Sequence, residues 1–274
     1  MIVFDRDKCI SCGICKSVCL PEAITMTQNG PEYTAPEACI LCGHCIAACP
    51  TYAVANNEMD MGEVEPYDEN AFTADPEKLL NLMKFRRSVR AYRPDPIPDA
   101  VLDRILAAGR WAPTARNLQR NSFIVIREAR KQIEALALGY LKEHGADLMA
   151  AKGTPEHERY SRRFGEWNDQ FASDSENTDP LFFGAPAVVL VVTNPVLATD
   201  AAGCAAYMEI QAAAEGLGCL YSGYFCSAAN ESAEMRKILG ISERKTVVRA
   251  MIMGYPAEKY LRTVPRAPLK IKYI

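Results

Sequence analysis

The feature that most constrains this chain is a cysteine pattern that occurs twice near the N-terminus. "CISCGICKSVC" at residues 9–19 and "CILCGHCIAAC" at residues 39–49 place four cysteines at the same spacing, thirty residues apart. Gly13 of the first run recurs as Gly43 of the second. An identical spacing in two stretches indicates a duplicated unit whose sulfur atoms share one chemical purpose.

The C-x2-C-x2-C-x3-C spacing is typical of [4Fe–4S] sites, because a short loop turns three successive thiolates toward one cubane. A glycine after the second cysteine suits a backbone that must approach the inorganic sulfides closely. Structural zinc also takes four sulfur ligands, but its usual pattern is two separated C-x2-C pairs. The third cysteine after two residues therefore favours iron and sulfide over zinc.

Residues 1–57 resemble a bacterial two-cluster ferredoxin, in which the fourth cysteine of each run ligates the other cluster. The second run ends Cys49-Pro50 as that pattern expects, whereas the proline after Cys19 comes one residue late. His44 is expected at the surface or beside a cluster rather than as a ligand. The resemblance implies one cluster on Cys9, Cys12, Cys15 and Cys49 and a second on Cys39, Cys42, Cys45 and Cys19.

Length and composition allow a second, larger domain and favour the cytoplasm. The chain has 274 residues, 49% of them apolar, which is enough for two packed cores. No basic-then-apolar leader is recognised at the start, and the longest near-continuous apolar run, 185–192, is too short to span a bilayer. We therefore expect a cytoplasmic protein without a membrane segment. In that compartment the other cysteines, Cys204, Cys219 and Cys226, are expected to be plain buried thiols.

The charge is divided unevenly along the chain. Residues 1–77 carry 3 basic and 13 acidic side chains, whereas residues 78–274 carry 28 basic and 21 acidic ones. Residues 58–77 hold eight acids and no Lys or Arg, which predicts a solvated acidic linker, or else a segment that lies against the basic second domain. The basic residues beyond it are dispersed, so nucleic-acid binding is not expected.

Residues 78–274 alternate helical and strand patterns, which predicts a layered α+β domain. The stretch 200–218 is apolar nearly all round and is expected to be a central helix. The predicted helices are 98–113, 128–144, 200–218 and 230–240. The predicted buried strands are 122–127 and 187–193, and 246–256 is predicted to be the last strand. Charged and small residues interrupt the pattern at 144–180, where we expect a mobile excursion over a site.

The segment "FRRSVRAYRPDPIP" at residues 85–98 crowds Arg86, Arg87, Ser88 and Arg90 into five positions. Guanidinium groups match phosphate oxygens bidentately, so such a cluster can hold a phosphate. Taken alone, this segment is more simply interpreted as the solvent-exposed, basic beginning of a helix. "WAPTARNLQRNSFIVI" at 111–126, "GCLYSGYF" at 218–225, "GYP" at 254–256 and "RAPL" at 266–269 change that interpretation.

The order and spacing of these five segments make residues 82–272 resemble the nitroreductase family of FMN enzymes. The resemblance implies an intertwined homodimer with FMN at the subunit interface. It also implies that Arg86, Arg87, Ser88 and Arg90 hold the phosphate end together with Arg266, for whose role Arg262 competes. Pro113, Thr114, Ala115 and Asn117 would lie along the flavin, and Ser222 and Gly223 would face the isoalloxazine edge. Thr114 stands where many relatives have Ser, and "NLQRN" departs from the usual Asn-x-Gln-Pro-Trp, which leaves Gln119 without an assigned role.

A ferredoxin domain fused to a flavin domain converts a one-electron supply into two-electron reduction. No G-x-G-x-x-G fingerprint follows a strand, and only three histidines occur, so neither a dinucleotide fold nor a Ser-His-acid site is expected. We predict an FMN-dependent, nitroreductase-like oxidoreductase that reduces small acceptors such as nitroaromatics or quinones. Relatives without a fused ferredoxin commonly take hydride from NAD(P)H at the flavin, so the clusters are expected to be either a second entry for electrons or the only one, with a ferredoxin or flavodoxin as the candidate donor. Tyr221, Tyr224 or the segment 144–180 could supply a proton. Reductive dehalogenation and a pure electron-transfer module are the alternatives.

Overall fold

The computed structural model describes residues 1–153 and 156–274. These residues fall into two compact units, Met1–Ala74 with Thr114–Leu118, and Asp75–Pro113 with Gln119–Ile274. We name them unit 1 and unit 2. Within the described ranges, no helix combines the length and the apolar character needed to cross a lipid bilayer.

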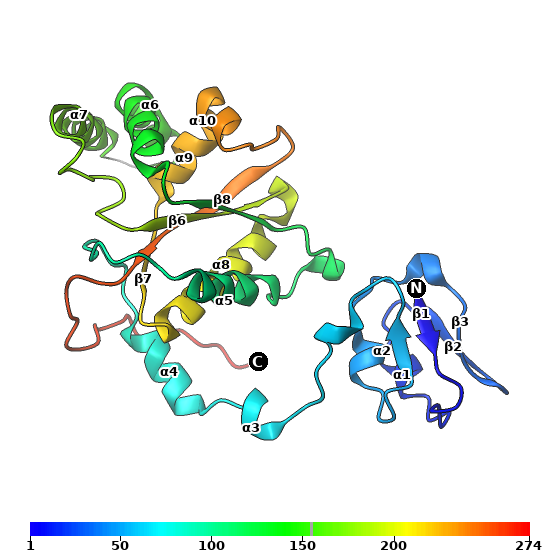
Figure 1. The fold of residues 1–274 in the computed structure, drawn as a ribbon. Helices are drawn as coiled ribbons and strands as arrows, with labels where there is room; N and C mark the ends of the chain where they lie inside the picture. Colours follow the sequence, from blue (N-terminus) through cyan, green and yellow to red (C-terminus); the bar gives the residue numbers. More distant parts are fainter. Residues whose placement is uncertain (154–155) are drawn as a thin grey trace. The chain divides into compact units, whose positions relative to one another are not determined.

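Unit 1 is built from two antiparallel strand pairs and several very short helices (Figure 1). β1 (Ile2–Phe4) pairs with β4 (Val54–Asn56), and β2 (Ile24–Thr27) forms a hairpin with β3 (Gly30–Tyr33). The helices are α1 (Ile14–Ser17), η1 (Pro36–Ala38), α2 (His44–Ala47), η2 (Met61–Glu63), α3 (Glu69–Phe72) and η3 (Ala115–Asn117). The acidic stretch 58–77 thus contains short helical turns rather than a fully extended linker.

The core of unit 1 is small. Ile2, Ile24 and Val54 are its buried aliphatic side chains, and they pack with the thiols of Cys15 and Cys45. A core of this size supplies little hydrophobic stabilisation, and domains so small usually depend on metals or disulfides to fold. The fold of unit 1 is therefore expected to depend on what its cysteines bind.

The sequence duplication produces duplicated backbone geometry. α1 and α2 begin directly after Gly13 and Gly43, whose φ angles are 77° and 73°. Ser11 and Leu41, two residues earlier, both have φ of 52°. These left-handed turns, which a glycine adopts without a Cβ penalty, bend each cysteine loop in the same way.

Unit 2 is organised around one antiparallel sheet with the strand order β5-β6-β8-β7. Its strands are β5 (Ser122–Ile126), β6 (Ala187–Thr193), β7 (Gly218–Tyr221) and β8 (Thr246–Gly254). All seven residues of β6 are buried, as expected for a central strand made of "AVVLVVT". Val188 and Leu190 face one core and Val189 and Val191 face the other, because successive side chains of a strand alternate between the two faces.

Helices cover both faces of this sheet (Figure 1). One face packs against α6 (Arg130–Ala151), α7 (His157–Ser173), α9 (Gly223–Glu231) and α10 (Ala233–Ile238). The other packs against α5 (Asp99–Arg110) and the apolar α8 (Ala198–Ala214), which η4 (Pro195–Leu197) precedes. α4 (Pro76–Phe85) begins the unit. The predicted mixture of helix and sheet is confirmed, with α8 as the central helix.

The excursion expected at 144–180 is mostly helical; its residues 154–155 lie outside the described ones. α6 continues to Ala151, and α7 follows as a second long helix. Phe164 is fully buried, and a Cβ on Gly145 would lie only 2.2 Å from its ring, so this glycine lets the two helices pack closely. Charged residues on the outer sides of α6 and α7 interrupt the apolar pattern, so the sequence alone does not reveal this packing.

The prediction of a buried strand at 122–127 is only partly correct. β5 pairs with β6 on one side, and no strand of the described residues pairs with its other side. Ser122, Phe123 and Ile124 are half-buried, and Val125 is 36% exposed. An apolar run cannot by itself distinguish a central strand from an edge strand that awaits a neighbour.

A buried carboxyl group joins α6 to the turn before β6. Glu134 is fully buried, and its Oε1 accepts the N–H of Leu181 at 3.0 Å. Among the described residues its Oε2 has no hydrogen-bond partner. Burial raises the pKa of Glu134 to about 8; the Asp179 carboxylate adds to the rise, and the Leu181 N–H and Lys131 oppose it.

This raised pKa predicts a pH-dependent stability. A carboxyl whose pKa is higher in the folded state contributes fully below its unfolded value near 4.5 and loses that contribution as the pH rises through about 8. The melting temperature should therefore fall between about pH 5 and about pH 9, and Glu134→Gln should flatten that fall. Calorimetry of both proteins across this range tests it. An equally steep fall in the variant would mean that another group titrates.

Candidate redox sites

The eight repeated cysteines line two small cavities in unit 1. Cys9, Cys12, Cys15 and Cys49 line the first cavity. Cys39, Cys42, Cys45 and Cys19 line the second cavity. Each cavity takes three cysteines from one run and the fourth from the other, which is the grouping that the ferredoxin resemblance implies.

The thiols around these cavities are free and surrounded by groups that suit thiolate ligands. The N–H of Ala53 donates to Cys49 Sγ at 3.2 Å, and the N–H of Leu41 donates to Cys39 Sγ at 3.4 Å. Burial raises the pKa of Cys49, but backbone hydrogen bonds from Thr51 and Ala53 outweigh it and leave that pKa low. Such N–H donors stabilise the negative sulfur of a cluster ligand.

The surroundings of the two innermost thiols favour their protonated form. Burial raises the pKa of Cys15, and it raises the pKa of Cys45 to about 11. Iron bound in the cavities would supply the positive charge that favours the thiolate form. Four converging thiols per cavity therefore fit a [4Fe–4S] cluster, whose assembly would release protons.

In unit 2 the arginine-rich segment runs beside β7. The N–H of Val89 donates to the Cys219 carbonyl at 3.1 Å, and Ser88 forms a β-bridge with Cys219. A Cβ on Gly218 would lie 2.3 Å from Val89 Cγ2, so only a glycine lets the segment lie this close. Because Ser222 follows β7 directly, the predicted phosphate segment and the predicted flavin-edge turn occupy the same edge of the sheet.

Arg86 is held by a carboxylate rather than left free. Its Nη1 lies 2.6 Å from Oε1 of Glu209, a residue of α8 that is only 9% exposed. Burial raises the pKa of nearby Tyr221, and the Glu209 carboxylate adds to the rise. The Tyr221 hydroxyl donates to the Ala205 carbonyl at 2.9 Å. The ion pair with Glu209 therefore fixes the start of the segment, and the Tyr221 hydroxyl is buried and already bonded.

Arg87 and Arg90 have no carboxylate partner among the described residues. Arg87 donates only to backbone carbonyls, those of Lys84 and Phe85, and Arg90 Nη1 donates to the Ser88 carbonyl at 3.4 Å. Two neighbouring guanidinium groups thus keep uncompensated positive charge at the sheet edge. Guanidinium groups are donors that match the oxygens of a phosphate group, so this pair could hold one.

The turn after β7 leaves an open approach to the backbone. Ser222 is 7% exposed, and its Oγ accepts the N–H of Phe225 at 3.3 Å, which caps α9. Gly223, the first residue of the helix, is exposed, and a Cβ there would meet nothing within 4 Å. No packing requirement explains this glycine, but a flat ring approaching the backbone would require it.

The helical excursion contributes an aromatic cluster next to this turn. The ring of Tyr224 lies 5.8 Å from Tyr160, 5.0 Å from Phe164 and 6.2 Å from Trp167, between ring centres. Tyr224 directly follows Gly223, so α7 packs beside the turn expected at the flavin edge. Such rings suit a planar organic acceptor.

The other predicted flavin residues are divided between the units. Pro113 belongs to unit 2, whereas Thr114, Ala115 and Asn117 group with unit 1. There Asn117 Nδ2 donates to the Leu41 carbonyl at 2.8 Å. Arg116, Asn117 and Gln119 have positive φ angles of 50°, 53° and 47°, a strained backbone of the kind found at functional loops.

Arg266 belongs to a C-terminal tail without regular structure. Residues 257–274 form no helix or strand, and every one of them is exposed. Arg266 makes no hydrogen bond or ion pair within the part of the chain that the structure describes. Its expected contact with the phosphate end stays a prediction, as does the rival role of Arg262.

The sequence interpretation missed two residues that position the site. Glu209 is the lone acid in the middle of the apolar helix α8, and that isolation was its sequence signal. Tyr92 is buried, and its hydroxyl reaches the carbonyls of Val89 at 3.0 Å and Ile252 at 3.1 Å. No sequence feature predicted that this tyrosine ties the arginine segment to β8.

Comparison with known proteins gives relatives for each part. A protein from Archaeoglobus fulgidus, whose name refers to NADH dehydrogenase and NAD(P)H nitroreductase, is 25% identical over 67% of this chain and 88% of its own. A ferredoxin from Pyrobaculum islandicum is 37% identical over 20% of this chain and 50% of its own. A solved nitroreductase from Bacteroides fragilis with bound FMN has a TM-score of 0.55 and 24% identity, and covers 72% of this chain and 99% of that one.

Two family models match the chain itself. The 4Fe-4S dicluster domain matches residues 1–50, which contain both cysteine runs. The nitroreductase family matches residues 83–255, well over half of the chain, and includes the arginine segment and the turn after β7. The chain therefore belongs to the nitroreductase family, and it joins that family's oxidoreductase domain to a ferredoxin-like iron–sulfur domain.

Proposed function

We propose that this protein reduces small oxidised organic acceptors, of nitroaromatic or quinone type, at FMN with electrons that arrive through two [4Fe–4S] clusters. The observation that carries the proposal is the combination of two four-cysteine cavities with a nitroreductase domain on one chain. When bound, the clusters supply one-electron transfer and FMN supplies two-electron chemistry. Eleven free cysteines also suit the reducing cytoplasm.

In this proposal the sheet edge of unit 2 binds FMN. Arg87 and Arg90 bind the phosphate, while Glu209 holds Arg86 so that the segment keeps its course along β7. Two charge-assisted contacts to a phosphate give orientation as well as affinity. Ser88, Pro113, Thr114, Ala115, Asn117, Ser222, Gly223 and Arg266 complete the proposed contacts.

The acceptor would bind where the backbone is open and aromatic side chains are near. The exposed Gly223 admits a flat ring system, and Tyr224 with Trp167 offers apolar surface that excludes water from one side. Tyr224 directly follows Gly223 in the sequence, whereas the Tyr221 hydroxyl donates to the Ala205 carbonyl. Tyr224 is thus the better candidate to orient or protonate an acceptor.

An acceptor screen under anaerobic conditions tests this function. The purified protein, with iron and flavin content measured, is reduced and then mixed with nitrobenzoates, quinones and halogenated phenols in turn. Rapid reoxidation of the flavin by a nitro compound or quinone, with the reduced product identified, is the expected result. Reoxidation by halogenated phenols alone, with release of halide, would contradict the proposal.

We also propose that the protein is a homodimer. Three apolar residues of α4, Leu80, Met83 and Phe85, are 49%, 42% and 44% exposed, and no residue of this helix is buried. A helix whose apolar side chains lack cover usually packs against another chain. This uncovered face supports the intertwined dimer that the family resemblance implies.

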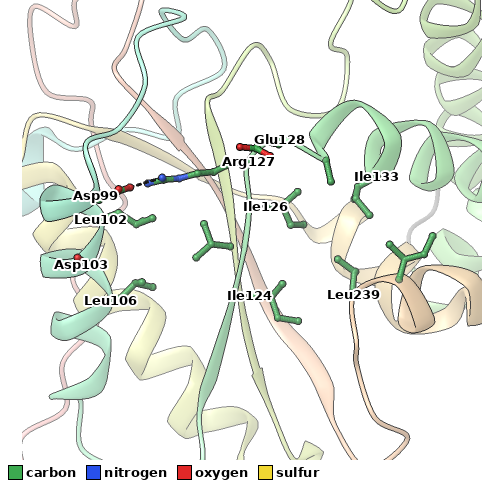
Figure 2. A pocket seen from close by; sticks show the side chains of 13 residues that line it. Asp99, Leu102, Asp103, Leu106, Ile124, Ile126, Arg127, Glu128, Ile133 and Leu239 are labelled. Carbon is green, nitrogen blue, oxygen red and sulfur yellow. Dashed lines mark hydrogen bonds and ion pairs between the residues drawn. The ribbon is translucent and has the colours of Figure 1, made fainter.

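A groove along the free edge of β5 supports the same conclusion (Figure 2). It has a volume of about 760 Å³ and lies between α5, α10 and the start of α6, with Asp99, Asp103 and Glu128 among its polar residues. The tail "LKIKYI" at 269–274 alternates apolar and cationic residues, the pattern of a strand. Arg127, which also lines the groove, already pairs with Asp99 at 2.5 Å. A strand from a second copy would pair with the edge of β5 and bring positive charge to Asp103 and Glu128.

Changing the tail should therefore dissociate the dimer. Leu269→Ser with Ile271→Ser removes two side chains that are 87% and 59% exposed in this chain. If the partner buries them, each contributes about 1.5–3 kcal/mol, so the dimer dissociation constant should rise by about a hundredfold or more. Analytical ultracentrifugation measures it, with Glu258→Gln as the control. An unchanged dimer would place the interface elsewhere.

A further inference from the structure

The two cysteine loops of unit 1 have the same backbone geometry but differ in the exposure of their side chains. Ile10 is 64% exposed and Cys12 is exposed, whereas the equivalent residues thirty positions later, Ile40 and Cys42, are half-buried. Lys16 is exposed on α1, and the half-buried Ile46 takes its place on α2. The loop of the first cavity is therefore the more accessible of the two.

The positive charge of residues 1–77 is also concentrated at this first loop. Arg6, Lys8 and Lys16 are the only basic side chains in residues 1–77, and all three flank Cys9–Cys15. Asp5 pairs with Lys8 at 3.0 Å, and Asp7 is the only other acid nearby in the sequence. Residues 5–16 thus carry a net charge of +1, while the rest of residues 1–77 carries −11.

The second loop has no such surface. Its flanking residues contribute no Lys or Arg, with Glu37 just before the loop and His44 within it. The Leu41 carbonyl already accepts a hydrogen bond from Asn117 of the same unit at 2.8 Å. A partner protein therefore finds an accessible, positively charged loop only at the first cavity.

We propose that this surface, formed by Arg6, Lys8, Ile10, Ile14 and Lys16, is the docking site of an acidic electron-carrier protein, and that electrons arrive at the first cluster. The inference rests on the proposed function. An acidic carrier is repelled by the rest of residues 1–77 and attracted here, so charge alone orients its approach. Ile10 and Ile14, 64% and 38% exposed, supply the apolar contact.

The electron transfer requires no reactant other than the carrier and the cluster. In each encounter the reduced carrier would give up one electron, and the cluster that Cys9, Cys12, Cys15 and Cys49 would hold would accept it, so that one oxidation balances one reduction. No bond is formed and no proton moves. Two encounters supply the electron pair that a two-electron acceptor requires.

The duplication provides a matched pair of variants. Ser17 and Ala47 are exposed at equivalent positions of α1 and α2, so Ser17→Glu and Ala47→Glu add the same charge beside the first and the second loop. The cluster-loaded variants are titrated at low salt with a small acidic two-cluster ferredoxin as the probe. Ser17→Glu should raise its Kd about three- to tenfold and Ala47→Glu less than about twofold, with both effects lost at high salt. Lys16→Gln should act like Ser17→Glu.

Equal effects of Ser17→Glu and Ala47→Glu, a larger effect of Ala47→Glu, or no effect of Ser17→Glu and Lys16→Gln would overturn the docking site. The iron content of each variant is measured first. If Ser17→Glu does not retain its clusters, Lys16→Gln replaces it in the comparison. Failure of this inference leaves the proposed function intact, provided that the flavin still receives its electrons through the clusters. Flavin reduction that proceeds without clusters would instead remove the proposed function.

Discussion

Cys42→Ala is expected to abolish acceptor reduction driven by a protein donor while FMN stays bound. Cys42 is one of four thiols at the second cavity, and three thiolates hold a cubane poorly. Iron content should fall to about half or below, because each [4Fe–4S] cluster holds four irons. Turnover with reduced ferredoxin should drop to the rate measured without protein, whereas dithionite should still reduce the flavin directly. Steady-state assays with both reductants measure this.

Cys204→Ala is the matched control. Cys204 is a free, buried thiol in the core of unit 2 and lines neither cysteine cavity. This variant should keep its iron, its flavin and both activities, apart from a modest loss of stability. If Cys42→Ala also kept full ferredoxin-driven turnover after proven loss of iron, the second cluster would have no part in the reaction.

Arg87→Ala is expected to weaken FMN binding about ten- to a hundredfold, since a charge-assisted contact contributes about 1.5–3 kcal/mol. Arg87 has no carboxylate partner among the described residues, so its removal leaves no buried charge behind. Its loss should therefore act on the phosphate contact rather than on folding. Fluorescence titration of the flavin-free protein with FMN gives the dissociation constant, and iron content should not change.

Arg93→Ala provides the comparison for this experiment. Arg93 is an exposed arginine of the same segment, but it pairs with Asp95 at 3.2 Å and stacks on Tyr255 at 5.2 Å. Its removal should leave FMN affinity within about twofold of the native value, as for an ordinary surface ion pair. Equal loss of affinity in both variants would show that general positive charge, not Arg87, binds the phosphate.

The sequence indicated which cysteines lie together in unit 1 because the constraints on such a site are local. A cluster needs thiols at fixed short spacings, and the thirty-residue repeat shows which loops are equivalent. The grouping of Cys49 with Cys9–Cys15 requires only that the second run folds back on the first. The antiparallel pairing of β1 with β4 brings the ends of this region together in the structure.

The sequence predicted less of unit 2 because its features depend on distant partners. β5 has the composition of a buried strand, yet whether its outer edge is covered depends on residues far away or on another chain. Glu209 and Arg86 lie 123 positions apart, so no local pattern reveals their ion pair. The stripe Tyr160, Phe164, Trp167 and Phe171 did have helical spacing, but the charges between these residues obscured it.

Anaerobic stopped-flow of the native protein with reduced ferredoxin shows whether electrons reach FMN through the clusters. The cluster and flavin absorbances are followed in one reaction, beside a cluster-free preparation that retains FMN. We expect the clusters to be reduced first, flavin reduction to follow, and the cluster-free preparation to show none. Flavin reduction that precedes cluster reduction, or that runs equally fast without clusters, would contradict this expectation.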